Sequence, residues 1–98
     1  MSVQTVRLRT DPEQVTAVSE QLKRLFAALR DSAPQRISYL AIRDAEEPVF
    51  TLILKLSDGA ENPLPLLPAA AAFRSWLPGQ TDDDPTPRLC TVIDRYSA

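Results

Sequence analysis

Apolar and polar side chains alternate over residues 3–10, which predicts a β-strand with Val6 and Leu8 on one face. The opposite face of this strand is polar and basic, and it carries Thr5, Arg7 and Arg9. Such a strand covers a core with one face and leaves its other face to solvent or to a partner.

A helix is predicted after this strand. Asp11 offers an N-terminal cap that Gln14 completes as a capping box, and Pro12 suits the first helical turn. Thr10 with Glu13 offers the same device one residue earlier. Pro34 disfavours helical geometry at the residue before it, so the helix is expected to end there. Its apolar residues recur at helical spacing and form one stripe: Val15, Val18, Leu22, Leu25, Phe26 and Leu29.

Two strands with a hairpin are predicted over residues 36–43 and 48–57, separated by the polar segment "DAEE". One face of the second strand carries Phe50, Leu52, Leu54 and Leu56, and the other carries Val49, Thr51, Ile53 and Lys55. The register of the first strand stays open. Either its odd or its even positions accompany the polar face of the sheet: Ile37, Tyr39 and Ala41, or Ser38, Leu40 and Ile42.

The segment "NPLPLLPAAAAFRSWLPGQ", residues 62–80, predicts a second helix with a rigid, proline-rich approach. Its apolar residues fall at helical spacing, and the Pro78-Gly79 pair ends the helix; the stripe is Leu66, Ala70, Phe73 and Leu77. Residues 88–96, "RLCTVIDRY", predict the last strand, in which Cys90 is expected to be a buried small apolar residue.

The order strand, helix, strand, strand, helix, strand is the ferredoxin-like βαββαβ pattern of the α+β class, in one domain over residues 1–98. Right-handed crossovers place both helices on one face of a four-stranded antiparallel sheet. The uncovered face mixes apolar with charged residues. We therefore expect a homodimer through this sheet face, with an interface of about 1,600 Å² in total.

Composition narrows the possible chemistry. The chain has no His and one Cys, which excludes Ser-His-Asp and Cys-His nucleophile pairs, common zinc sites and disulfides within the chain. No metal and no cofactor are expected. Three acidic residues, Asp82–Asp84, lack the spacing of a calcium loop.

The net charge of -2 gives no reason to expect nucleic acid as a partner, although Arg7, Arg9 and Lys55 could form a basic patch on the open sheet face. The longest run without charges, residues 62–73, is too short to span a bilayer, and "MSVQTVRLRT" lacks the features of a signal peptide. A cytoplasmic protein without a membrane partner is therefore expected.

The element order, the length, the central hairpin and the "AFRSWL" segment of the second helix resemble the dimeric α/β-barrel superfamily, and within it the antibiotic-biosynthesis-monooxygenase-like proteins. The resemblance implies a homodimer whose sheets meet face to face, with a pocket in each protomer between sheet and helices. It also implies one of three outcomes: oxidation of aromatic quinol-like substrates without metal or flavin, degradation of haem, or no known activity.

The sequence departs from that family at recognisable positions. Its members often carry Glu-x-Trp after the third strand and a His on the following helix, whereas this chain reads "LKLSDGAENPLPLL" there and has no His. An Asn and a Trp are commonly implicated in the cofactor-free oxygenases, and Asn62 and Trp76 are the residues available here. No catalytic residue is assigned.

Five residues are candidates for binding a ligand, and each also has a plainer structural interpretation. Trp76 could stack on a planar ligand or pack in the core, and Arg74 could orient an anionic or carbonyl group or lie on a solvated helix face. Asn62 could bind a substrate oxygen or cap a turn, and Tyr39 could supply a pocket hydroxyl or be half buried in a strand. Phe73 is expected to line the same pocket.

Three functions follow from these patterns. The first is a cofactor-independent monooxygenase-like enzyme acting on an aromatic or polyketide-like small molecule. The second is a non-catalytic dimeric module that binds a small apolar or aromatic ligand or serves a structural role. The third is a monomer whose open face binds anions or single-stranded RNA, which the lack of exposed aromatic residues on the central strands disfavours.

Overall fold

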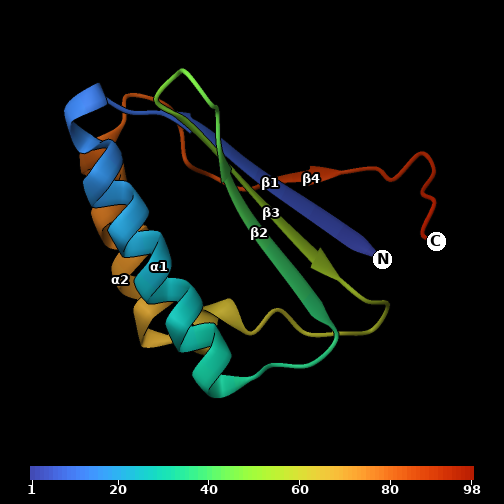
Figure 1. The fold of residues 1–98 in the computed structure, drawn as a ribbon. Coiled ribbons are helices and arrows are strands. Elements are labelled where there is room, and N and C mark those ends of the chain that lie inside the picture. Colours follow the sequence, from blue (N-terminus) through green and yellow to red (C-terminus); the bar gives the residue numbers. More distant parts are fainter.

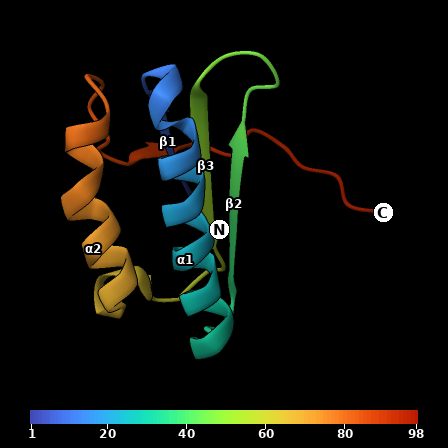
Figure 2. The same cartoon turned by 60° about the vertical axis from the view of Figure 1, so that its left-hand side comes forward.

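One face of a four-stranded antiparallel sheet is covered by two helices in the computed structural model, which describes residues 1–98 (Figure 1). The spatial order of the strands is β2-β3-β1-β4, and every neighbouring pair is antiparallel. The predicted βαββαβ order is confirmed by the elements β1 (Ser2–Arg9), α1 (Val15–Ser32), β2 (Ile37–Arg43), β3 (Val49–Leu56), α2 (Pro68–Trp76) and β4 (Arg88–Cys90). Figure 2 shows α1 and α2 side by side on the same face of the sheet.

The core lies between the sheet and the helices. Leu8 pairs with Phe50 and Val6 with Leu52, so the even-numbered residues of β1 and β3 share the helix-covered face. The stripe predicted for α1 packs on this face through Val18, Leu22, Leu25 and Leu29, which are all buried. The largest cluster of buried residues is made of Leu8, Val18, Leu22, Leu25, Leu29, Phe50, Leu52, Ala70, Phe73 and Leu77.

The register of β2 settles the alternative that the sequence left open. Tyr39 pairs with Leu54 and Ala41 pairs with Leu52, so the odd-numbered residues of β2 face the helices. The even-numbered residues lie on the open face, where Leu40 is 52% exposed and Ile42 is 48% exposed. The open face therefore presents apolar side chains beside its charged ones.

Backbone hydrogen bonds, and not side-chain caps, are found at both ends of α1. The predicted capping box is wrong, because the Asp11 side chain makes no cap hydrogen bond and a short 3₁₀ turn precedes the helix. The N–H of Gln14 instead donates to the Asp11 carbonyl at 2.9 Å. The helix ends before Pro34, as predicted, with Ala33 in the left-handed region at φ 47° and its N–H donating to the Leu29 carbonyl.

The second helix is shorter than predicted. It begins at Pro68, because residues 64–66 form a separate 3₁₀ turn, and a further 3₁₀ turn follows it from Leu77. Leu66 therefore does not belong to the buried stripe and is 83% exposed. Ala70, Phe73 and Leu77 are buried as predicted.

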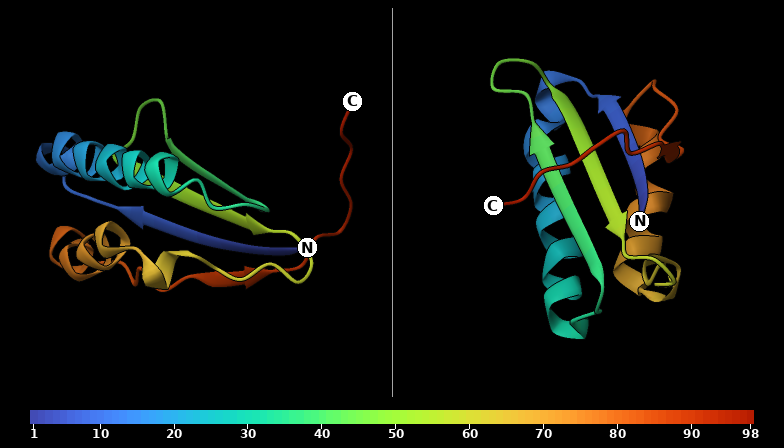
Figure 3. Two further views of the ribbon diagram at one scale, coloured as in Figure 1. Left: turned by 90° about the horizontal axis from the view of Figure 1, so that it is seen from below. Right: turned by 90° about the vertical axis from the view of Figure 1, so that its right-hand side faces the viewer.

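The last strand is also shorter than predicted, since β4 spans three residues in place of residues 88–96. Cys90 pairs with Val3, and β1 begins only one residue before Val3. The residues after Cys90 therefore have no strand beside them to pair with. Those residues leave the sheet as an extended tail (Figure 3). The expected burial of Cys90 is wrong as well, because β4 is an edge strand and the thiol is exposed on the open face.

Pairing between β1 and β4 is also interrupted at the other end of β4. Pro85 and Pro87 have no N–H to donate to a ladder, and regular pairing covers only Val3 to Thr5 of β1. The chain rejoins β1 at Arg9, whose N–H donates to Asp83 Oδ2 at 2.6 Å and whose carbonyl accepts from Thr81 Oγ1 at 2.6 Å. The segment between Asp83 and Arg88 stands away from β1. No helix in the chain is both long enough and apolar enough to cross a bilayer.

Candidate functional site

A small cavity lies between the helix-covered face of the sheet and the segment that leads into α2. We call it the inner cavity. Its volume is about 100 Å³. Three of the five predicted ligand residues line it, namely Tyr39, Asn62 and Arg74, together with apolar side chains that include Val6, Leu52, Leu54 and Leu64.

Tyr39 reaches the inner cavity from β2. Its ring packs against Phe26 of α1 with a distance of 5.2 Å between ring centroids. Burial raises the pKa of the Tyr39 phenol above its ordinary value, so the hydroxyl stays protonated at neutral pH. The Tyr39 hydroxyl is not a fully buried group without a hydrogen-bond partner. It can therefore donate a hydrogen bond to a molecule in the cavity.

Asn62 has a structural role that its position before a proline suggested. Its Oδ1 accepts a hydrogen bond from the Leu64 N–H at 3.0 Å, which caps the 3₁₀ turn of residues 64–66. The turn interpretation is therefore confirmed. The side-chain NH₂ group is not used by this cap and is available to the cavity.

Arg74 stands on α2 and brings a positive charge to the inner cavity. It takes no part in the three ion pairs of the chain, which join Met1 to Asp58, Arg9 to Glu47 and Lys23 to Glu20. A guanidinium in this place can bind an anionic or carbonyl oxygen. Its side chain is exposed, as expected for a residue on the wet side of the helix.

The other two predicted ligand residues are used in packing. Phe73 is 7% exposed and belongs to the core cluster. Trp76 packs against that cluster and lies 6.2 Å from Phe73 between ring centroids. Neither side chain lines the inner cavity. A ligand stacked on Trp76 therefore remains a prediction from the sequence.

The size and lining of the inner cavity limit its chemistry. Pockets for drug-sized molecules have volumes of about 300–1,000 Å³, and a cavity of about 150 Å³ is enough to hold benzene. At about 100 Å³, the inner cavity is smaller than both, so it can take one small ring at most. A phenol, an amide and a guanidinium can orient and polarise such a ring, but no carboxylate lines the cavity to act as a general base.

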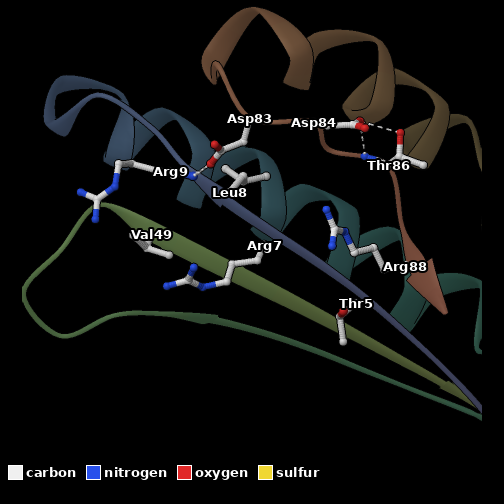
Figure 4. Close-up of a pocket in the computed structure, with 9 residues that line it drawn as sticks. All are labelled: Thr5, Arg7, Leu8, Arg9, Val49, Asp83, Asp84, Thr86 and Arg88. Atoms are coloured by element: carbon white, nitrogen blue, oxygen red, sulfur yellow. Dashed lines mark hydrogen bonds between the residues drawn. The ribbon is translucent and has the colours of Figure 1, made fainter. Parts of the chain in front are cut away.

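A second and larger cavity opens on the other face of the sheet, where the chain stands away from β1. We call it the outer cavity; its volume is about 570 Å³ (Figure 4). Its lining is mostly polar, and it consists of Thr5, Arg7, Leu8, Arg9, Val49, Asp83, Asp84, Thr86 and Arg88. Lys55 does not join it, because Lys55 pairs with Val3 at the opposite end of β1.

The sequence alone did not identify the outer cavity. Arg7 and Arg9 could be assigned to the open face from their alternation with Val6 and Leu8. The contribution of Arg88 depends on the pairing of β4 with β1, which places Arg88 opposite Thr5. The available signal was the pair of prolines before β4, since prolines interrupt a ladder. No group of three or more metal-ligating side chains occurs in the chain.

No known protein family matches the sequence, and no curated protein matches it at a significant level. Similar solved structures do exist. A crystal structure of an antibiotic biosynthesis monooxygenase superposes with a TM-score of 0.72 at 16% identity, covering 96% of this chain and 100% of that one. The chain shares the fold of that monooxygenase.

Two further structures have the same architecture. A protein of unknown function from Nitrosomonas europaea superposes with a TM-score of 0.72 at 14% identity, covering 99% of this chain and 93% of that one. An L-rhamnose mutarotase from Formosa agariphila superposes with a TM-score of 0.52 at 15% identity, covering 99% of this chain and 96% of that one. At these identities the likeness establishes the ferredoxin-like fold, which different functions share.

Proposed function

We propose that this chain is a homodimeric small-molecule-binding protein whose inner cavity takes a small aromatic or otherwise apolar ring. The observation that carries this proposal is the convergence of Tyr39, Asn62 and Arg74, from three separate segments, on one cavity. That cavity lies between sheet and helices, where the resemblance to the monooxygenase-like proteins implies a ligand pocket.

The lining indicates the ligand chemistry. Val6, Leu52 and Leu54 give the cavity an apolar floor that suits the face of a ring. The protonated Tyr39 hydroxyl and the Arg74 guanidinium are hydrogen-bond donors, so the ring should carry an accepting oxygen such as a quinone carbonyl.

The open face of the sheet supports the homodimer. Leu40 and Ile42 are about half exposed there, and no element of the chain covers them. A second copy that covers this face would remove both side chains from water, which favours association. We further propose a cytoplasmic location, because a free, exposed Cys90 suits a reducing compartment.

A second candidate is the cofactor-independent oxygenation of an aromatic or polyketide-like substrate. The similarity of fold to an antibiotic biosynthesis monooxygenase favours it. The absence of a carboxylate from the inner cavity places it second, because such a reaction needs a group that removes a proton from the substrate. Incorporation of an oxygen atom from dioxygen into hydroquinone, above the reaction without protein, would establish this activity.

Titration with hydroquinone and benzoquinone tests binding in the inner cavity. Tyr39→Phe removes the donor and keeps the ring, so we expect the affinity to fall about threefold to tenfold. Tyr96→Phe is the matched control, since Tyr96 is 91% exposed and lies in the tail. Equal affinities of the two variants, or no binding by the wild-type chain, would contradict the proposal.

Sedimentation at micromolar concentration tests the homodimer separately. We expect the wild-type chain to sediment as pairs and Leu40→Lys to sediment as single chains, because a charge would be buried at the interface. Leu66→Lys is the matched control, since Leu66 is as apolar and even more exposed but lies away from the open face. Single chains in the wild-type sample would refute the homodimer and leave the cavity proposal standing.

A further inference from the structure

The outer cavity exists because the pairing of β1 with β4 stops early. Thr5 pairs with Arg88, and the same register continued by two residues would place Thr86 opposite Arg7. The Thr86 N–H instead donates to Asp84 Oδ1 at 3.0 Å, and the prolines on either side of Thr86 have no N–H. The space that a continued β4 would have filled is therefore open.

The two carboxylates beside this space are already engaged within the chain. Asp83 accepts the N–H of Arg9 at 2.6 Å. Asp84 accepts both the hydroxyl and the N–H of Thr86, and these hydrogen bonds hold the pKa of the Asp84 carboxyl below its ordinary value. Both groups help to shape the loop, and each keeps lone pairs that can accept further hydrogen bonds.

Of the three arginine side chains that line the outer cavity, one forms an ion pair and two do not. Arg9 forms an ion pair with Glu47, with 2.9 Å between Nη1 and Oε2. Arg7 and Arg88 take part in no ion pair, although both line the cavity. In Figure 4 both lie on the open side of the sheet with Thr5; the Arg7 side chain extends across β3, and the Arg88 side chain extends from β4 along β1.

We propose that the outer cavity binds a small hydroxylated organic anion, either a carboxylate or a phosphate ester, between Arg7 and Arg88. A guanidinium matches the geometry of carboxylate and phosphate oxygens, and two of them suit one doubly charged group. The Thr5 hydroxyl lies on the same floor and adds a donor. The volume of about 570 Å³ exceeds what an inorganic ion fills and suits a small metabolite.

The carboxylates at the rim set the second half of the specificity. A ligand that places its anionic group between Arg7 and Arg88 presents its remaining atoms to Asp83 and Asp84. Hydroxyl groups there can donate to the free lone pairs of the carboxylates, whereas further anionic groups are repelled. The site therefore favours a hydroxy acid or a sugar-like phosphate over a plain polyanion.

This inference does not rest on the inner cavity. The two cavities have no lining residue in common, and they lie on opposite faces of the sheet. The outer cavity does lie on the face through which we propose pairing, so the sedimentation of every variant is measured together with its binding. A variant that still pairs like the wild type and loses the anion reports on the cavity alone.

Calorimetric titration at low ionic strength with glycerate and with glycerol phosphate tests the site and distinguishes the two anion types. We expect one of them to bind at millimolar concentration or below, and Arg7→Gln and Arg88→Gln each to weaken it by about tenfold or more. Arg24→Gln makes the same charge change on α1, lines no part of the cavity, and should bind like the wild type.

Propionate, which is glycerate without its hydroxyl groups, tests the role of the rim. Weaker binding of propionate than of glycerate supports the contribution of Asp83 and Asp84, and equal binding overturns it. The whole proposal is overturned if neither glycerate nor glycerol phosphate binds, if Arg24→Gln weakens binding as much as Arg7→Gln, or if the double variant of Arg7 and Arg88 binds like the wild type.

Discussion

The two faces of the sheet are made by alternate residues of the same strands, and they differ in almost every physical respect. On the helix-covered face, Leu8 is 1% exposed and Leu52 is 4% exposed. On the open face, Leu40 and Ile42 keep about half of their surface in water, and three arginines surround a polar cavity. Burial on one face stabilises the fold, which leaves the other face free to be selected for recognition.

The largest test of this difference compares two neighbours on β3. Leu52→Ala should lower the free energy of unfolding by about 2–5 kcal/mol, because it leaves a cavity in a packed core. Ile53→Ala, on the half-buried open face, should lower it by about 1 kcal/mol or less in dilute solution. Urea denaturation measures both.

Protein concentration sharpens the same comparison. The loss caused by Leu52→Ala should not depend on concentration, whereas the loss caused by Ile53→Ala should grow with it, since the proposed pairing through the open face would add stability only when copies associate. Equal losses at every concentration would show that the two faces are energetically alike.

A smaller effect is expected at alkaline pH from Tyr39 on the helix-covered face. Burial raises the pKa of its phenol, so the stability it contributes is present below the ordinary value of about 10 and is lost as the pH rises through that value toward the folded pKa. The chain has two tyrosines, so in Tyr96→Phe the phenolate absorbance reports on Tyr39 alone. A transition at or below the ordinary value would contradict the burial of Tyr39.

The smallest effect is expected at acidic pH from Asp84 beside the open face. Hydrogen bonds from Thr86 lower the pKa of Asp84, so its stabilising contribution is present above the ordinary value of 3.8 and is lost as the pH falls through the lower folded pKa. The free energy of unfolding falls between neutral and strongly acidic solution, and Asp84→Asn should make this fall slightly smaller. The effect is small because the carboxyl is fully exposed.

Urea midpoints at the two ends of that pH range measure the effect of Asp84→Asn. Asp82→Asn is its matched control in the same loop. If both variants respond to acid in the same way, the hydrogen bonds from Thr86 do not contribute to stability.

Residue alternation was enough to predict the faces of β1 and β3, because most of their apolar residues, such as Leu8 and Phe50, occupy one parity. It was not enough for β2, where Tyr39 and Leu40 make both parities apolar. Only pairing with β3 decides which parity is covered. The length of β4 could not be predicted from the sequence either, because it depends on which residue of β4 lies opposite the first residues of β1.

The candidate site could be predicted in part. Tyr39, Asn62 and Arg74 line the inner cavity, whereas the two aromatic residues of α2 pack into or against the core. A helical stripe predicts burial but does not show whether a ring meets a cavity or another side chain. The outer cavity arises from residues that lie about eighty positions apart, such as Thr5 and Arg88, and local patterns do not contain that pairing.

The prolines before β4 have one more consequence, which concerns growth of the sheet by addition of strands from other molecules. At the β4 side, a three-residue strand preceded by Pro85 and Pro87 gives an incoming strand very little to bond to. The rim at β2 is seven residues long and contains no proline. Two sheets can therefore join through their β2 edges, and the resulting pair has no further edge that readily accepts a strand. This protects the chain from forming fibrils by backbone pairing between strands.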